Sequence, residues 1–134
     1  DPSQVDEEID FMSMDVSFIS LKLIFPVAAK LLKDGGSILC LVKPQFEAGR
    51  EQVGKNGIVR DRKVHEEVIE KVISYAQEND LIAKNLTFSP ITGAKGNIEY
   101  LLHLNKHKNI GYNKSYIDSF NVSEVVQISH AELV

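Results

Sequence analysis

An apolar run of strand length, residues 37–42 (SILCLV), constrains the fold of this chain more than any other feature. Such a run is typical of a strand buried on both faces. Upstream, residues 11–20 (FMSMDVSFIS) have the pattern of a strand whose end is marked by Asp15 and Ser17. Between the two runs, apolar residues recur at helical spacing before Gly35 and Gly36, which we expect to end a helix. The sequence thus predicts strand, helix and parallel strand, joined by a right-handed crossover.

The same alternation continues to the end of the chain. Residues 46–60 carry three glycines and read as a loop, after which Asp61 caps a helix that reaches about Gln77. A third strand is expected within residues 81–91 and a fourth over residues 98–104. Their connection is so short that the last strand must be antiparallel. Asn121 and Glu124, at capping-box spacing, predict a closing helix, and the fold class is α/β with parallel strands and a final antiparallel strand.

Composition sets limits on the class of protein. A chain of 134 residues, 43% of them hydrophobic, is sufficient for one domain with a modest core. Its net charge of −4 provides no global basic field, so contact with nucleic acid would need a local patch. The single cysteine, Cys40, lies in an apolar run and suits the core of a cytoplasmic protein. No apolar run reaches the roughly 18 residues of a membrane span, so we expect no membrane partner.

Three charged residues stand at predicted strand ends. Asp15 ends one parallel strand, Lys43 ends its neighbour, and Glu99 begins the antiparallel strand, so all three should lie at one edge of the sheet. Open α/β sheets place their active sites at that edge. Taken alone, each residue is better explained as a solvated strand end. Together they are more suggestive, because a lysine between two carboxylates in a partly buried cleft is a recognisable catalytic arrangement.

The four histidines, in contrast, predict no metal site. His65 lies near a helix start, His103 on a strand, His107 in a polar segment and His130 in the last helix, without ligand spacing between them. We expect them to be surface residues or hydrogen-bonded core residues.

Several phrases of the sequence resemble a known family when taken together. DVSFISL (15–21), LVKPQFEAGRE (41–51), GIVRD (57–61), VHEEVI (64–69) and GNIEYLLHL (96–104) are similar to the carboxyl-terminal half of TlyA-type proteins. These proteins, often labelled hemolysins, are FtsJ-like ribosomal RNA methyltransferases. The resemblance covers most of residues 5–105 and implies a Rossmann-like sheet that binds S-adenosylmethionine and methylates a ribose 2′-hydroxyl.

The catalytic pattern of that family is lysine, aspartate, lysine, glutamate. The resemblance assigns the aspartate to Asp15, which would also face the cofactor, the second lysine to Lys43 and the glutamate to Glu99. Lys43 is expected to stabilise the attacking oxygen, while the two carboxylates orient its amine.

Substrate contacts are expected from the segment after Lys43. Gln45 is expected to shape the substrate pocket, as is Phe46 unless it serves in packing. Arg50, Lys55 and Arg60 are candidates to bind RNA phosphates, and a solvated loop is the alternative for them.

The sequence departs from the family pattern at its beginning. The first catalytic lysine and the glycine-rich cofactor loop should both precede Asp15, and neither stands among the residues before it. The small RNA-binding domain of TlyA-type proteins is missing as well. We therefore expect an inactive fragment: residues 1–106 as the carboxyl-terminal half of the methyltransferase domain, and residues 107–134 as its polar linker and closing helix.

Two alternatives to methyl transfer remain at this point. The hemolysin label suggests a membrane-active protein, although no long apolar segment or basic amphipathic helix supports pore formation. The other alternative is a non-catalytic interaction unit. Since half a sheet exposes an edge that another chain can pair with, a homodimer is expected in that case.

Overall fold

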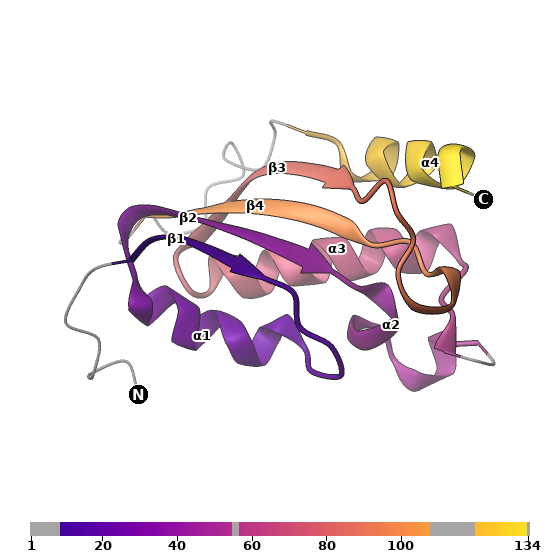
Figure 1. The fold of residues 1–134 in the computed structure, drawn as a ribbon, viewed down its shortest axis with the longest axis horizontal. Coiled ribbons are helices and arrows are strands. Elements are labelled where there is room, and N and C mark those ends of the chain that lie inside the picture. The colour runs from indigo at the N-terminus through magenta and orange to yellow at the C-terminus, as the bar shows by residue number, and fades with distance from the viewer. Residues whose placement is uncertain (1–8, 55–56, 108–119, 134) are drawn as a thin grey trace.

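The computed structural model describes residues 9–54, 57–107 and 120–133, which form a four-stranded sheet with helices on one face (Figure 1). The strands lie in the order β1-β2-β4-β3. Their bounds are β1 (Ile9–Met14), β2 (Leu32–Val42), β3 (Leu81–Phe88) and β4 (Tyr100–Lys106). β1 and β2 are parallel, and β4 runs antiparallel to both of its neighbours, β2 and β3. The predicted α/β class with an antiparallel last strand is therefore confirmed.

The first unit is the predicted strand, helix and parallel strand. Met14 pairs with Cys40, and the helix between them is α1 (Leu21–Leu31). Ser20 caps this helix by accepting a hydrogen bond from the Lys22 backbone nitrogen at 3.1 Å. β1 ends at Met14, so Asp15 marks its end as predicted, and residues 15–20 form a loop in which Phe18 has a φ of 66°.

The glycines that were predicted to end α1 lie in β2 instead. The helix ends at Leu31, and Gly35 and Gly36 fall where the register of the parallel pair shifts, with a φ of 83° at Gly35. A buried lysine, rather than a glycine, stabilises this helix end. Lys106 donates to the carbonyl of Ala29 and, at 2.7 Å, to that of Leu32, so an ammonium binds the free carbonyls at this helix end.

The segment after β2 was predicted to be a loop, but it contains two short helical turns. They are α2 (Pro44–Glu47) and the 3₁₀ turn η2 (Arg50–Gln52). The next helix is confirmed as α3 (Arg62–Gln77), with the Asp61 carboxylate accepting from the Lys63 nitrogen at 2.8 Å.

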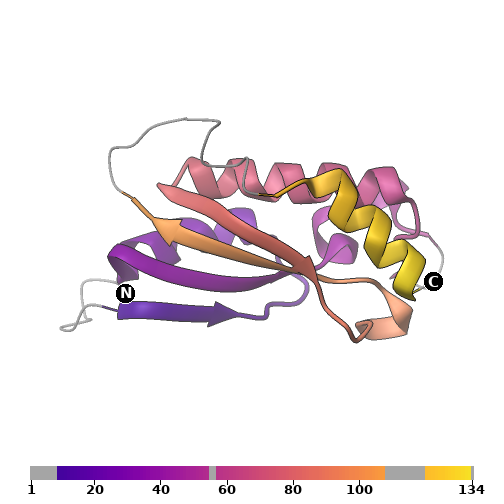
Figure 2. The ribbon, with the colours of Figure 1, turned by 90° about the horizontal axis from the view of Figure 1, so that it is seen from above.

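The last two strands are joined by a connection that includes the 3₁₀ turn η4 (Ala94–Gly96). β4 begins two residues later than predicted, at Tyr100. The predicted closing helix is α4 (Val122–Leu133), which packs against α3 and β3 (Figure 2). Its cap is also confirmed, because Asn121 Oδ1 accepts from the Glu124 nitrogen at 3.0 Å.

The core lies between the sheet and the helices. Every second side chain of β2 and β4, including Cys40, faces it and is buried, and burial raises the pKa of the Cys40 thiol to about 12. On the opposite face Phe11 and Leu39 remain 58% and 37% exposed. The carboxyl ends of the three parallel strands meet at one end of the molecule, close to α2 and η4 (Figure 1).

Candidate functional site

Lys43 directly follows β2 and lies at the predicted edge of the sheet. Its amine forms an ion pair with the Asp15 carboxylate, which follows the neighbouring strand β1, and donates a hydrogen bond to Ser17 Oγ at 3.1 Å. The Lys43 side chain is nearly buried, whereas Asp15 is largely exposed. Parallel pairing of β1 and β2 thus brings Asp15 and Lys43 together, and the amine is held by two oxygens of one loop.

Glu99 lies just before β4 and is only 8% exposed. Its Oε2 accepts a hydrogen bond at 3.1 Å from Gln45 Nε2, two residues after Lys43. Among the residues that the structure describes, no ion pair joins Glu99 to Lys43. The three predicted residues therefore lie at one edge, but Glu99 is linked to Lys43 through Gln45 rather than directly.

Glu47 connects this edge to the start of α1 and was given no role from the sequence. Its carboxylate accepts from Ser20 Oγ at 2.6 Å and from the Leu21 nitrogen at 2.9 Å, and the side chain is buried. Burial raises the pKa of Glu47 more than these two hydrogen bonds lower it. Since α1 has no acidic residue in its first turn, Glu47 supplies the negative charge from outside the helix.

Two phenylalanines form an aromatic contact beside Lys43. The ring centroids of Phe18 and Phe46 are 4.8 Å apart, and Phe18 is 89% exposed. The loop that carries Asp15 thus presents an aromatic ring to solvent, which is suited to stacking on an unpaired base. The positive φ of Phe18 could not have been read from the sequence.

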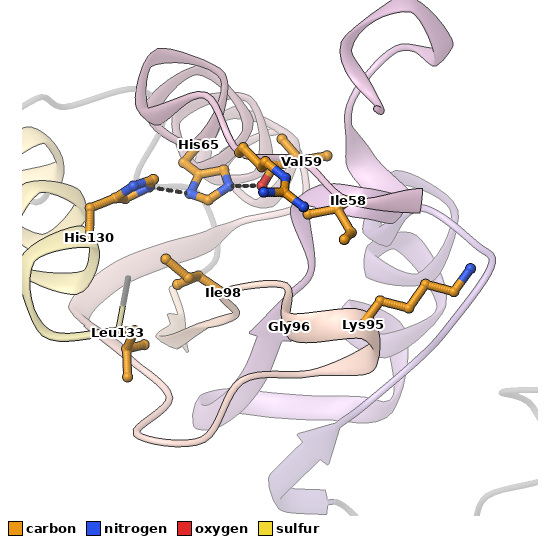
Figure 3. A pocket seen from close by; sticks show the side chains of 9 residues that line it. Ile58, Val59, His65, Lys95, Gly96, Ile98, His130 and Leu133 are labelled. Carbon is orange, nitrogen blue, oxygen red and sulfur yellow. Dashed lines mark hydrogen bonds between the residues drawn. The ribbon is translucent and has the colours of Figure 1, made fainter. Parts of the chain in front are cut away.

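Of the three predicted phosphate-binding residues, the structure describes Arg50 and Arg60, and Arg60 belongs to a cavity that Lys43 does not line. Arg50 is exposed on η2, and Lys55 lies outside the described residues. Arg60 borders a cavity of about 250 Å³ on the side of α3 and α4, together with Lys95 and a pair of histidines (Figure 3). The histidines are His65 and His130. His65 Nδ1 and His130 Nε2 are 2.9 Å apart, although the two residues are distant in the sequence.

The loop before β4 is fixed by Asn97. Its side chain accepts from the Val59 nitrogen at 3.0 Å and donates to the Gly57 carbonyl at 2.9 Å, and its backbone carbonyl accepts from the Gly93 nitrogen at 2.7 Å. A Cβ on Gly93 would overlap the Glu99 carboxylate. Asn97 and Gly93 together define the position of Glu99.

The described part of the chain shows neither a metal-binding cluster nor a membrane-spanning helix. In residues 9–54, 57–107 and 120–133, no group of three or more His, Cys, Asp or Glu side chains could hold a metal ion. The histidine pair belongs to no such group. Over the same ranges, none of the helices combines the length and the apolar character that crossing a bilayer requires.

Comparison with known proteins shows the family of the chain. The sequence model described as FtsJ-like methyltransferase matches residues 1–106. "Putative rRNA methyltransferase YqxC" of Bacillus subtilis is 60% identical over 95 residues, which cover 71% of this chain and 34% of that protein. "16S/23S rRNA (cytidine-2'-O)-methyltransferase TlyA" of Mycobacterium tuberculosis is 36% identical over 103 residues, or 77% of this chain and 38% of its own length. The chain thus spans well under half of either relative.

A solved structure supports the same assignment. The protein described as "Putative hemolysin from Streptococcus thermophilus" matches with a TM-score of 0.87 and 48% identity, over 98% of this chain and 46% of that chain. Since the family match covers most of the chain, and since these relatives agree with it in sequence and fold, the chain belongs to the FtsJ-like methyltransferase family, in its TlyA or hemolysin A branch.

Proposed function

We propose that this chain works as the carboxyl-terminal half of a methyltransferase domain that transfers a methyl group from S-adenosylmethionine to a ribose 2′-hydroxyl of ribosomal RNA. Residues 1–106 provide the sheet, and residues 107–134 provide a linker and the closing helix. The observation that carries the proposal is the Lys43 amine, held by Asp15 and Ser17 at the carboxyl edge of the sheet. The printed name of the Mycobacterium tuberculosis relative supports the reaction type.

Lys43 is proposed as the catalytic residue. A ribose 2′-hydroxyl is a poor nucleophile, so the site has to hold it in line with the methyl group and stabilise its oxygen as the proton is lost. The Lys43 ammonium does this by hydrogen bonding and charge, while Asp15 and Ser17 fix its direction.

Gln45 and Glu99 are proposed to position the substrate. Gln45 Nε2 donates to Glu99, and this contact sets the amide orientation, because the reverse orientation would place two acceptor oxygens together. Gln45 Oε1 is then buried without a partner among the described residues. A buried acceptor without a partner is costly, so we propose that Gln45 turns when the nucleotide binds and accepts a hydrogen bond from one of its hydroxyl or amino groups.

The residues around Asp15 fit one side of a cofactor site. A cavity of about 170 Å³ lies beside Asp15, lined also by Ser13, Met14, Leu41 and Leu101. S-adenosylmethionine, when bound, supplies an electrophilic methyl group, and the Asp15 carboxylate provides a negative charge close to it. We propose that the remaining walls come from the part of the longer relatives that this chain does not span, and that this chain alone does not transfer methyl groups.

The RNA partner is proposed to be contacted by the basic residues after α2. Arg50 and Lys55 would follow the phosphates near the target ribose, and Arg60 would bind farther away, because it borders the separate cavity. Because the proposed substrate is ribosomal RNA, we propose a cytoplasmic location for the protein.

The test uses the chain and a protein extended to the length of its relatives. Calorimetric titration measures binding of S-adenosylmethionine to each, and methylation of ribosomal RNA is measured for Lys43→Met and for Lys30→Met, an exposed control on α1. We expect cofactor binding by the extended form alone, a loss of about 10²- to 10⁴-fold in rate for Lys43→Met, and no change for the control. A Lys43→Met enzyme with the full rate would refute the catalytic assignment.

The uncovered face of the sheet favours a second function, which is association. Phe11 and Leu39 are exposed on that face, and β1 is an edge strand whose outer side is open among the described residues. Open edges pair with other strands, so we propose that this chain dimerises through β1 when nothing else covers it. A strictly monomeric sedimentation profile would contradict this proposal.

A further inference from the structure

A cavity separate from the Lys43 site lies between the segment before α3, the η4 turn and the end of α4 (Figure 3). Its volume is about 250 Å³. Four of its lining residues are basic side chains, and none is acidic. The basic residues are Arg60, His65, Lys95 and His130, and apolar side chains such as Ile98 and Leu133 complete the wall. This combination suits a ligand that has an anionic group and an apolar, planar part.

The two histidines form a directed hydrogen-bond chain on one side of the cavity. His65 Nε2 lies 2.9 Å from the Val59 carbonyl, which can only accept, so this nitrogen carries a proton. In neutral His65 the other nitrogen, Nδ1, is therefore an acceptor, and His130 Nε2 donates to it at 2.9 Å. Neutral His130 then has an unprotonated Nδ1, which is free to take up a proton when an anion arrives.

A third group can accept a hydrogen bond if His65 gains a proton. Tyr100 OH lies 3.0 Å from His65 Nδ1 and 2.9 Å from Ser129 Oγ. Ser129 donates to the Val126 carbonyl at 2.7 Å, so the Tyr100 hydroxyl donates to Ser129 and leaves its oxygen available to His65. A charged His65 therefore donates from Nδ1 to the Tyr100 oxygen, and the hydrogen bond that His130 Nε2 donated to the neutral ring is lost.

Burial is the main cause that lowers the pKa of both histidines. His130 further lowers the pKa of His65, Arg62 lowers that of His130, and Asp61 raises both. The charged groups around the pair, taken from the elements packed against it, are Arg60, Asp61, Arg62, Glu66 and Lys95. A bound phosphate would favour the charged forms, so binding takes up protons and strengthens as the pH falls.

One loop contributes to both the cavity and the candidate catalytic edge. Ile98 lines the cavity, while the next residue, Glu99, binds Gln45 beside Lys43. Asn97 ties the same loop to the segment before Arg60 through the Val59 nitrogen. Ile98 in the cavity wall and Glu99 at the catalytic edge are consecutive residues, so the cavity is a candidate site for another nucleotide of the RNA strand whose target ribose lies at Lys43.

We propose that this cavity binds one nucleotide of the RNA substrate next to the methylated one, with its phosphate on Arg60, Lys95 and His130 and its base against the apolar wall. The inference rests on the proposed function, since it takes RNA as the substrate. It adds a specificity site that is separate from the reacting atoms.

The test is carried out on the full-length protein with a ribosomal RNA fragment. The double variant Arg60→Ala, Lys95→Ala removes two exposed cations of the cavity, and Lys22→Ala, Lys30→Ala removes two exposed cations from α1 as the matched control. We expect about tenfold weaker RNA binding for the cavity variant, with the dependence of log K on log salt reduced by about 0.7 per lost contact. We also expect a raised KM with an unchanged kcat, because the cavity does not touch the reacting ribose.

The pH dependence provides a second readout that a general surface charge would not give. As the pH falls below the ordinary histidine pKa of about 6.5, RNA binding by the unmodified protein should strengthen more than binding by His130→Gln, because burial lowers the pKa of His130 in the free protein and a bound phosphate raises it. Equal RNA affinity and salt dependence of the cavity and control variants would overturn the inference, as would inorganic phosphate binding without an effect on RNA. If the cavity variant fails to bind RNA normally but Lys43→Met still methylates fully, the proposed catalytic role fails and the RNA site stands.

Discussion

Replacing Glu47 tests whether the start of α1 depends on a carboxylate from another segment. In Glu47→Ala, the Leu21 nitrogen and the Ser20 hydroxyl lose their acceptors. A buried donor that is left without an acceptor costs about 1–3 kcal/mol, and removal of the buried carboxylate offsets part of this cost. We expect a loss of about 2–4 kcal/mol in the free energy of unfolding, or roughly 6–15 °C in Tm for a chain of this size.

The pH dependence of the free energy of unfolding, measured for the same variants, separates the effect of the Glu47 charge from the effect of its packing. The pKa of Glu47 is raised above its ordinary value of 4.5 in the folded state, so the folded state binds the proton more tightly than the unfolded state. The stability that this group contributes is therefore greatest below pH 4.5 and is lost as the pH rises through the folded pKa. Glu47→Gln should lack this dependence.

Urea unfolding at several pH values measures both effects, with Glu67→Gln on the exposed side of α3 as the control. The control should change stability by less than about 0.5 kcal/mol. If Glu47→Ala and Glu67→Gln proved equally stable, or if Glu47→Gln kept the pH dependence of the unmodified chain, the carboxylate would not be the cap that we describe.

Two further substitutions test other parts of the molecule. Lys106→Met keeps the length of the side chain but removes the ammonium from the Ala29 and Leu32 carbonyls, so thermal unfolding should show a loss of about 2–4 kcal/mol, and an unchanged Tm would contradict the capping role. Gly93→Ala puts a methyl group where the Glu99 carboxylate lies; methylation by the full-length protein should fall while the far-ultraviolet circular dichroism is unchanged, and full activity would show that the position of Glu99 is unimportant.

The sequence predicted best what depends on local pattern and on sheet topology. The helix after Asp61 followed from its cap and its apolar face, and the contact between Asp15 and Lys43 followed because both residues end neighbouring parallel strands. The first residue of β2 was missed because glycines ordinarily mark a helix end, whereas here a distant lysine binds the last carbonyls.

Contacts between distant segments account for what sequence reasoning missed at the site. His65 and His130 are on different helices, and only the packing of α4 on α3 brings their rings together. Glu47 caps a helix that begins 26 residues earlier in the chain, a role for which no spacing rule exists. Both contacts require the three-dimensional fold before they can be seen.

The position of β4 inside the sheet has a consequence for how the chain folds during synthesis. β4 pairs with β2 on one side and with β3 on the other, although it is the last of the four strands to be made. Until it leaves the ribosome, β3 has no neighbour in the sheet and β2 is paired only with β1. In a nascent chain that ends before Tyr100, the β1–β2 pair and β3 are therefore joined through the packing of α3 on α1 and β3 rather than through the sheet, which is completed by long-range contacts that form late and comparatively slowly.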